Sequence, residues 1–265
     1  LMVGVSYVIR RNMKESPLFA KAKKEGKTST NPLKESFGNK FNFKFVLLAL
    51  FGAVMGQGVV WYTGQFYAMS FMQKVMNIES AQVDSMMALA LFLGTPLFVL
   101  FGWLSDKVGR KPIMMIGMLL AIIAYRPIYK TMYHSVEIQG KEVTKDGLTE
   151  KRTAKVHEKI ATDSIITFHT EKVFTDGFSM KKDSIVHWSA SGPIMIDGKP
   201  QTPVVKEAIT VNADTRWLLI LMVFIQVVFV TMVYGPIAAF LVEMFPVRIR
   251  YTSMSLPYHI GNGVF

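Results

Sequence analysis

The sequence predicts an all-α membrane helix bundle that carries a small β-rich insert outside the membrane. The first observation behind this is composition: 51% of the 265 residues are apolar and only 18% are charged, against roughly 25% in a typical soluble domain. The second is a series of long runs without charge, and the third is a stretch over 134–214 with strong β-turn signals. Cysteine is absent, which excludes disulfides and thiolate sites.

The charge-free runs define the membrane spans. Residues 45–73, 85–105 and 217–242 contain no Asp, Glu, Lys or Arg, and a helix needs about 20 apolar residues to cross the hydrocarbon core. A shorter run from 112 becomes a full span if two long basic side chains, Arg126 and Lys130, reach the outer interface. The expected spans are therefore about 45–72, 85–105, 112–133 and one that begins near 215. Partial apolar runs over 1–9 and 251–265 predict the end and the start of two further spans, so the sequence reads as a fragment.

The distribution of Lys and Arg predicts the orientation. Segments 10–44, 106–111 and 243–250 hold fifteen of the thirty basic residues and only five of the nineteen acids. By the positive-inside rule these three connectors are cytoplasmic, and 10–44 is a cytoplasmic loop. The stretch 134–214 is almost neutral, with eleven basic and twelve acidic residues, and falls on the extracytoplasmic side. We therefore expect a multi-pass protein of the cell membrane whose partner is the lipid bilayer. Because the net charge of +11 follows membrane topology, we expect no nucleic-acid partner.

The stretch 134–214 is too long for a simple connector. Turn signals with glycine, Asp-Gly above all, lie between β-forming residues in 136–143, 173–180 and 194–199, which predicts hairpins. Between the first two signals, 148–161 is polar and compatible with a helix. The histidines of this region show no ligand spacing, so we expect no metal and no cofactor. They are His134, His157, His169 and His187.

A motif follows the second span. It reads Gly102-Trp-Leu-Ser-Asp106-Lys-Val-Gly109-Arg110. Gly102 lets a neighbouring helix approach closely, Gly109 permits a tight reversal, and Arg110 offers a fork of donors to a carboxylate. The motif resembles the G-x-x-x-D-x-x-G-R-K/R loop of the major facilitator superfamily, and it lies where that family has it, between two spans on the basic side.

A second motif ends the fourth span. Gly235-Pro236 is followed by Glu243-Met-Phe-Pro and then by Arg248 and Arg250. It is similar to the element that ends the tenth helix of sugar porters and metabolite:proton symporters. The resemblance implies a cytoplasmic gate that closes and opens as the transporter alternates. The alternative is a surface ion pair that contributes about 0–1 kcal/mol. The gate residues would be Gly102, Asp106, Gly109, Arg110, Glu243, Arg248 and Arg250.

A third element sets the register. Glu15-Ser16-Pro17, followed by a Lys-rich stretch, is similar to the segment that opens the central loop of the same families, and 253–265 looks like their eleventh helix. The resemblance therefore implies the C-terminal half of the major facilitator fold. It would comprise the end of helix 6, helices 7 to 10 within 45–133 and 215–242, and the start of helix 11. The N-terminal half of the same chain would be its partner.

Polar and aromatic residues inside the spans are candidates for substrate contact, because each is costly in lipid unless it is paired. The alternative for any one of them is a contact between helices. In sugar porters the seventh helix carries binding glutamines and a tyrosine pair, which this sequence matches loosely, with Gly56 where the second glutamine would be. Arg126 either reaches the interface beside Pro127 or guides anionic substrates. The candidates are Gln57, Trp61, Tyr62, Gln65, Tyr67, Gln226, Tyr234, His259 and Asn262.

The resemblance implies a secondary active transporter that works by alternating access. The expected activity is proton-coupled symport of a metabolite such as a carboxylate or an amino-acid-like osmolyte. The alternatives are a sugar transporter of the same superfamily and a non-transporting receptor that uses the β insert. No Ser/His/Asp arrangement, phosphate loop or metal cluster points to an enzyme. No Asp or Glu lies within a span, so the proton-carrying carboxylate is expected in the other half of the chain.

Overall fold

The computed structural model describes residues 6–7, 11, 17–156, 164–189, 192–193, 195–196, 199–200 and 203–264. The chain forms two compact units. Unit 1 comprises Leu1–Trp61, Phe98–Met118 and Val230–Phe265, and unit 2 comprises Tyr62–Leu97 and Leu119–Phe229. The Glu15 and Ser16 of the third motif and His157 of the insert lie outside the described residues.

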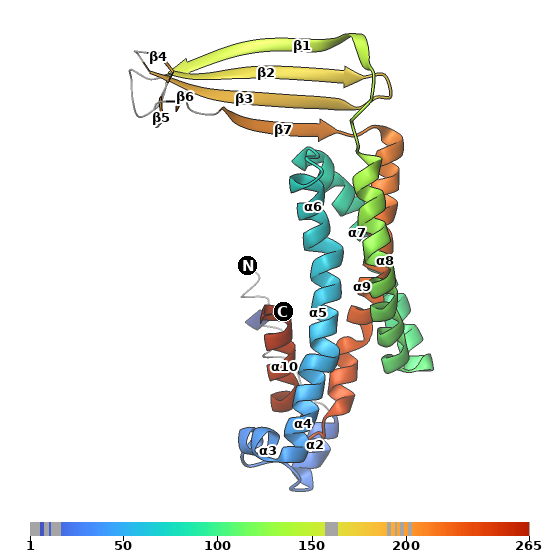
Figure 1. The fold of residues 1–265 in the computed structure, drawn as a ribbon. Helices are drawn as coiled ribbons and strands as arrows, with labels where there is room; N and C mark the ends of the chain where they lie inside the picture. Colours follow the sequence, from blue (N-terminus) through green and yellow to red (C-terminus); the bar gives the residue numbers. More distant parts are fainter. Residues whose placement is uncertain are drawn as a thin grey trace. The chain divides into compact units, whose positions relative to one another are not determined.

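Helices make up most of the described chain (Figure 1). Among the described residues, four helical stretches are long and apolar enough to cross a membrane, namely Lys40–Lys74, Ser80–Val108, Arg110–Ser135 and Ala213–Met244. These helices fit the predicted membrane helix bundle by their length and composition. The helices are α2 (Pro17–Lys24), α3 (Pro32–Gly38), α4 (Lys40–Leu47), η1 (Leu48–Val54), α5 (Met55–Tyr62), η2 (Thr63–Tyr67), α6 (Ala68–Lys74), α7 (Ser80–Val108), α8 (Arg110–Ser135), α9 (Ala213–Met244) and α10 (Arg250–Val264).

The stretch Lys40–Lys74 is one continuous helix with two π-helical segments, η1 and η2, on either side of α5. Each π-helical turn widens the backbone spiral and leaves it with poorer hydrogen-bond geometry, and such segments recur at functional sites. Several glycines lie in this stretch, Gly52, Gly56 and Gly58 among them. The charge-free run predicted the helix but gave no signal for the change of helix type.

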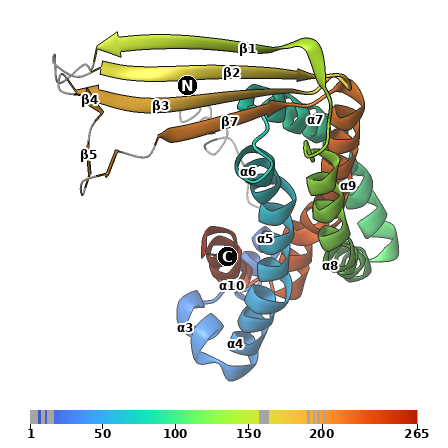
Figure 2. The ribbon, with the colours of Figure 1, turned by 45° about the horizontal axis from the view of Figure 1, so that its top comes forward.

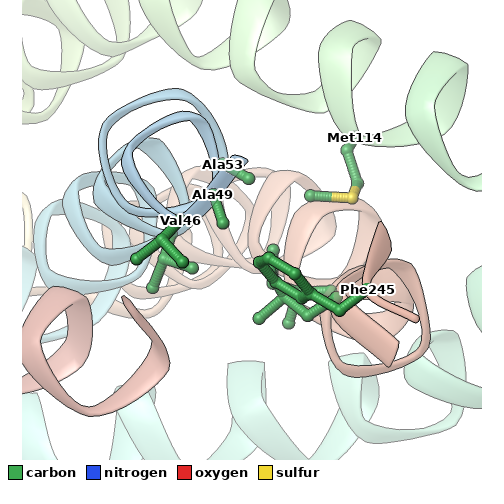
Figure 3. Close-up of a cluster of buried hydrophobic side chains, with 8 residues drawn as sticks. Val46, Ala49, Ala53, Met114 and Phe245 are labelled. Atoms are coloured by element: carbon green, nitrogen blue, oxygen red, sulfur yellow. The ribbon is translucent and has the colours of Figure 1, made fainter. Parts of the chain in front are cut away.

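The core of unit 1 is apolar. Val46, Ala49 and Ala53 from α4 and η1 face Met114 of α8 and Phe245, which follows α9 (Figure 3). The alanines leave room for the larger side chains, so the helices pack closely at this level. The cluster places the start of α8 beside the end of α9, and this positions the charged residues described below.

A close contact joins α10 to η1. A Cβ built on Gly261 would collide with the side chain of Val54, whose own Cβ would lie 2.9 Å away, whereas a Cβ on Gly263 meets no heavy atom within 4 Å. We therefore expect Gly261→Ala to destabilise the full-length protein by about 1–3 kcal/mol, since the packed helices must shift. Gly263→Ala removes a helical glycine at a free position and should be neutral or slightly stabilising. Thermal unfolding of the two purified variants tests this, and an equal effect of both would contradict it.

Unit 2 contains the β insert. Strands β1 (Val143–Val156), β2 (Ser164–Phe174) and β3 (Ser179–Ser189) follow one another in an antiparallel sheet, and β7 (Val204–Thr210) pairs with the other side of β3 (Figure 2). Short strands complete it: β4 (Gly192–Pro193) pairs with β3, and β5 (Met195–Ile196) pairs with β6 (Lys199–Pro200). The predicted β-rich insert is confirmed as a small antiparallel sheet.

The turn signals of the insert gave mixed results. The Asp176-Gly177 signal is confirmed, because it joins β2 to β3 with Gly177 at φ +84°. Gly140 lies instead in the turn between α8 and β1. The helix-compatible reading of 148–161 was wrong as far as the structure describes it, since residues to Val156 belong to β1. There, each residue from Leu148 onward pairs with one of β2, and this ladder outweighs the weak local helix preference.

An ion pair holds the β2–β3 turn. The Lys141 Nζ lies 2.6 Å from Asp176 Oδ2, and Asp176 also accepts a hydrogen bond from the backbone N–H of Phe178. The hydrogen bond from Lys141 is the main cause that lowers the pKa of Asp176 below its ordinary value of 3.8. Because the pKa of Asp176 is lower in the folded than in the unfolded state, the ion pair stabilises the fold at pH values above the ordinary pKa. This stabilisation is lost as the pH falls through the lowered pKa of the folded state.

We expect the carboxyl carbon of Asp176 to titrate below pH 3.8 by NMR of the full-length protein. Lys141→Met should move the midpoint back toward the ordinary value. Lys145→Met, at an exposed lysine of β1, is the matched control and should leave the titration unchanged. If the titration midpoint of Asp176 is the same in Lys141→Met as in the wild type, Lys141 is not the cause of the lowered pKa.

Hydrogen bonds within unit 2 attach the end of β7 to the start of α7. The backbone N–H of Ile209 donates to the carbonyl of Asn77, and the N–H of Glu79 donates to the carbonyl of Ile209. The Gln82 side chain binds both backbone groups of Val211 at 2.9 Å. The sheet is therefore fixed to the helices of its own unit by paired backbone groups.

Candidate functional site

Arg110 is the centre of a charged cluster in unit 1. Its guanidinium makes two contacts with Glu243, from Nε to Oε2 and from a terminal nitrogen to Oε1, both at 2.8 Å. A third contact reaches Asp106 Oδ1 at 3.2 Å. The Arg110 side chain is 21% exposed, whereas the two carboxylates are about 60% exposed. One partly buried guanidinium therefore links the end of α7, the start of α8 and the end of α9.

This cluster is suited to repeated making and breaking. A bidentate Arg–carboxylate pair has defined geometry, yet its exposed carboxylates are well solvated when they separate. Exposed ion pairs contribute only about 0–1 kcal/mol. Gly109, at φ +104°, makes the reversal between α7 and α8 and so places Asp106 one turn before Arg110.

Close backbone packing lies next to the cluster. A Cβ on Gly235 would come within 3.3 Å of the Phe98 carbonyl and 3.5 Å of the Gly102 nitrogen. Gly235 therefore lies where α9 approaches the backbone of α7. A Cβ on Gly102 would meet no heavy atom within 4 Å, so the close approach that the sequence predicted for Gly102 falls on Gly235 instead. A larger residue at Gly235 would push the ends of these helices apart.

The two arginines after α9 have different partners. Arg248 lies 2.6 Å from Glu35 on α3, and Arg250 Nε donates to the Phe245 carbonyl at 3.1 Å. The structure thus joins Arg110, Asp106 and Glu243, and it places Arg248 against the connector helix α3.

Contacts from α3 were not predicted. Ser36 and Ser253 are both fully buried, and their hydroxyl oxygens are 2.8 Å apart. Asn31 caps α3 by accepting from the Lys34 N–H. The signal in the sequence was Asn31 followed directly by proline, which is typical of a helix start.

Four aromatic side chains form a second cluster in unit 1. The rings of Trp61 and Tyr234 are 5.2 Å apart, Phe98 meets Tyr234 edge-on at 6.2 Å, and the hydroxyls of Tyr234 and Tyr258 are 3.4 Å apart. The side chains come from α5, α7, α9 and α10. We call Trp61, Phe98, Tyr234 and Tyr258 the aromatic cluster.

Gln57 lies one helical turn before Trp61 on α5. Its side chain is 1% exposed, and neither its amide nitrogen nor its amide oxygen has a hydrogen-bond partner in the part of the chain that the structure describes. A buried amide without partners costs about 1–3 kcal/mol. Such a group is a candidate for binding a ligand that satisfies it.

The other predicted residues divide between the units. In unit 1, Asn262 donates to the Tyr258 carbonyl and His259 is exposed. In unit 2, Gln226 is fully buried and donates at 3.4 Å to the Met222 carbonyl of its own helix. The structure also places Tyr62, Gln65, Tyr67 and the exposed Arg126 in unit 2.

Of these unit 2 residues, Tyr67 belongs to an aromatic group centred on Tyr129. Tyr129 stacks edge-on with Tyr67 at 5.2 Å and with Phe71 at 5.1 Å. The Tyr129 hydroxyl donates to the carbonyl of Thr63, in η2, at 2.6 Å. This bond satisfies a carbonyl in a π-helical segment, which is a structural role. Among the described residues no group of three or more His, Asp or Glu is arranged to hold a metal ion.

Comparison with known proteins shows which family part of the chain resembles. Residues 1–129 match the Major Facilitator Superfamily. A relative from Staphylococcus aureus (strain COL), named "Putative proline/betaine transporter", is 25% identical over 133 residues, which are 47% of this chain and 27% of the relative. A relative of the same name from Staphylococcus haemolyticus (strain JCSC1435) is 28% identical over 125 residues, 44% of this chain and 25% of the relative. The chain spans about a quarter of the length of these relatives. No solved structure is significantly similar to it.

Proposed function

We propose that this chain, whose residues 1–129 match the Major Facilitator Superfamily, is a member of that superfamily and contributes the helices of a C-terminal half to a secondary transporter for a small organic solute. Members of this superfamily are generally carriers rather than enzymes. The apolar helices fit a multi-pass membrane protein. The excess of Lys and Arg in 10–44, 106–111 and 243–250 supports a cytoplasmic location for these connectors, and 134–214 would then be extracytoplasmic.

The observation that carries the mechanism is the Arg110 cluster. It links the ends of α7, α8 and α9 on the side that carries the basic surplus. In alternating access, the cytoplasmic ends of the helices close while the site faces outward and separate when it faces inward. We propose that the Arg110–Glu243 pair forms in the closed state and breaks on opening. Solvated carboxylates keep the cost of breaking small enough for rapid cycling.

The proposed substrate is an amino-acid-like osmolyte such as proline or betaine. Such solutes carry an ammonium group and a carboxylate. The face of an indole or phenol ring attracts an ammonium by about 0.5–2 kcal/mol, which suits Trp61 and Tyr234. The unpartnered amide of Gln57, one turn away on α5, offers N–H donors to a carboxylate. The printed names of the relatives favour the same class.

Proton coupling rests on the family resemblance. The uncharged runs 45–73, 85–105 and 217–242 hold no carboxylate for it, and the carboxylates of the described spans lie near the helix ends, so the proton carrier would belong to the other half. A sugar is the alternative substrate, because amides and aromatic rings also bind sugars.

Uptake into proteoliposomes tests the proposal. The full-length transporter should accumulate radiolabelled betaine or proline when the external pH is lowered, and excess glucose should not compete. Trp61→Ala should raise KM about tenfold, since an aromatic face contributes about 0.5–2 kcal/mol to binding of a cation, while Trp61→Tyr retains most of the affinity. Competition by glucose, or uptake that Trp61→Ala leaves unchanged, would reject this substrate class.

A further inference from the structure

A cavity of about 500 Å³ lies in unit 1 among α2, the connector after it and the turn between α9 and α10. It is separate from the aromatic cluster and from the Arg110 cluster, since none of their residues lines it. We call it the connector cavity. Its volume falls within the range of small-molecule sites, about 300–1,000 Å³.

The walls of the connector cavity are mainly apolar. Phe19 of α2, Val242 of α9 and Met254 of α10 line it, together with Ile249 of the turn, which is buried. Tyr251 also lines the cavity, although it is 80% exposed. Tyrosine is enriched where a membrane helix meets the headgroup region, because its ring is apolar and its hydroxyl is hydrated. The apolar walls favour a ligand with a hydrocarbon part.

The polar part of the lining is basic. Arg248 and Arg250 both contribute, with Thr28, Ser29 and Thr252 as hydroxyl donors, and no Asp or Glu is among the described residues that line the cavity. Each guanidinium has five N–H donors. The contacts with Glu35 and the Phe245 carbonyl engage only some of them. Segment 10–44, whose Phe19, Thr28, Ser29 and Pro32 line the cavity, carries ten basic residues against three acids in its sequence.

An apolar cavity with two guanidinium groups fits an amphiphile with an anionic head. On the proposed orientation, the turn between α9 and α10 lies at the cytoplasmic face of the membrane, where anionic lipids supply such molecules and basic pockets bind their headgroups. We propose that the connector cavity binds one anionic glycerophospholipid. Arg248 and Arg250 contact its phosphate, and the apolar walls contact its glycerol and the first part of its acyl chains. A phosphate at Arg248 competes with Glu35, so the lipid also weakens the attachment of α3.

Binding of fluorescent phosphatidylglycerol to the delipidated full-length transporter tests this without any substrate. We expect saturable binding that unlabelled phosphatidylglycerol displaces, and that phosphatidylcholine and inorganic phosphate do not. Arg248→Gln/Arg250→Gln should weaken binding about tenfold or more, as expected for loss of charge-assisted hydrogen bonds. Lys24→Gln/Lys34→Gln removes the same charge at exposed residues outside the lining and should change binding less than about threefold.

Val247→Trp is a second variant that keeps both arginines and fills the cavity from the turn. This variant should also weaken lipid binding. Its thermal unfolding transition shows whether the purified variant is folded. Equal loss in the Lys24/Lys34 control would mean a diffuse surface attraction, and displacement by inorganic phosphate would mean a simple anion site. Either result overturns the lipid assignment and leaves the transport proposal untouched.

Discussion

Arg110→Glu in the full-length transporter is expected to abolish substrate uptake, and Glu243→Arg in the same protein is expected to restore part of it. The single change places three carboxylates where one guanidinium now bridges two, at contacts of 2.8 and 3.2 Å. Losing two partly exposed ion pairs, each worth about 0–1 kcal/mol, and adding repulsion among three carboxylates together costs about 1.5–3 kcal/mol, and each 1.4 kcal/mol is a factor of ten. Uptake should therefore fall by at least about tenfold.

In the double variant the charges at positions 110 and 243 are exchanged, so one attraction between α8 and α9 remains. Partial recovery in Arg110→Glu/Glu243→Arg would show that the attraction itself matters for transport. Lys24→Glu, a reversal of charge at an exposed residue of α2, controls for net charge and should leave uptake near that of the wild type. Uptake by Arg110→Glu at the wild-type rate would reject the gate.

Gln57→Leu is expected to stabilise the transporter without substrate and to weaken substrate binding. The amide of Gln57 is buried and has no hydrogen-bond partner among the residues that the structure describes, so an apolar side chain of similar size removes a penalty of about 1–3 kcal/mol. If the amide binds the substrate, the same change removes donors from the carboxylate, and KM should rise about tenfold. Thermal unfolding and uptake measure the two effects, which have opposite signs.

Gln226→Leu is the matched control, because Gln226 is also fully buried but its amide nitrogen already donates to Met222. We expect a smaller gain in stability, since a hydrogen bond is lost as well. A purely structural role for Gln57 would give a lower unfolding temperature and an unchanged KM, and that pair of results would reject Gln57 as a substrate contact.

The sheet shows where local sequence signals are sufficient and where they fail. Asp176-Gly177 predicted its hairpin correctly, because only a few conformations satisfy that turn and glycine adopts its positive φ without strain. The segment from Leu148 to Val156 was misjudged, because its polar residues suit a helix equally well. Only the pairing with β2 decides its conformation.

Sequence alone determined the membrane helices, since backbone groups in lipid must be satisfied within each span and a span of this length needs an uncharged run. It also indicated that Arg110 and Glu243 are charged residues at helix ends. Tertiary structure decided their partners: Arg110 meets an acid 133 positions away, Arg248 meets Glu35, and Trp61 meets Tyr234. Within the described residues, it also left the side-chain amide of Gln57 without a hydrogen-bond partner. The physical reason is that spans follow from the local cost of charge and unpaired backbone in lipid, whereas side-chain partners depend on how distant helices pack.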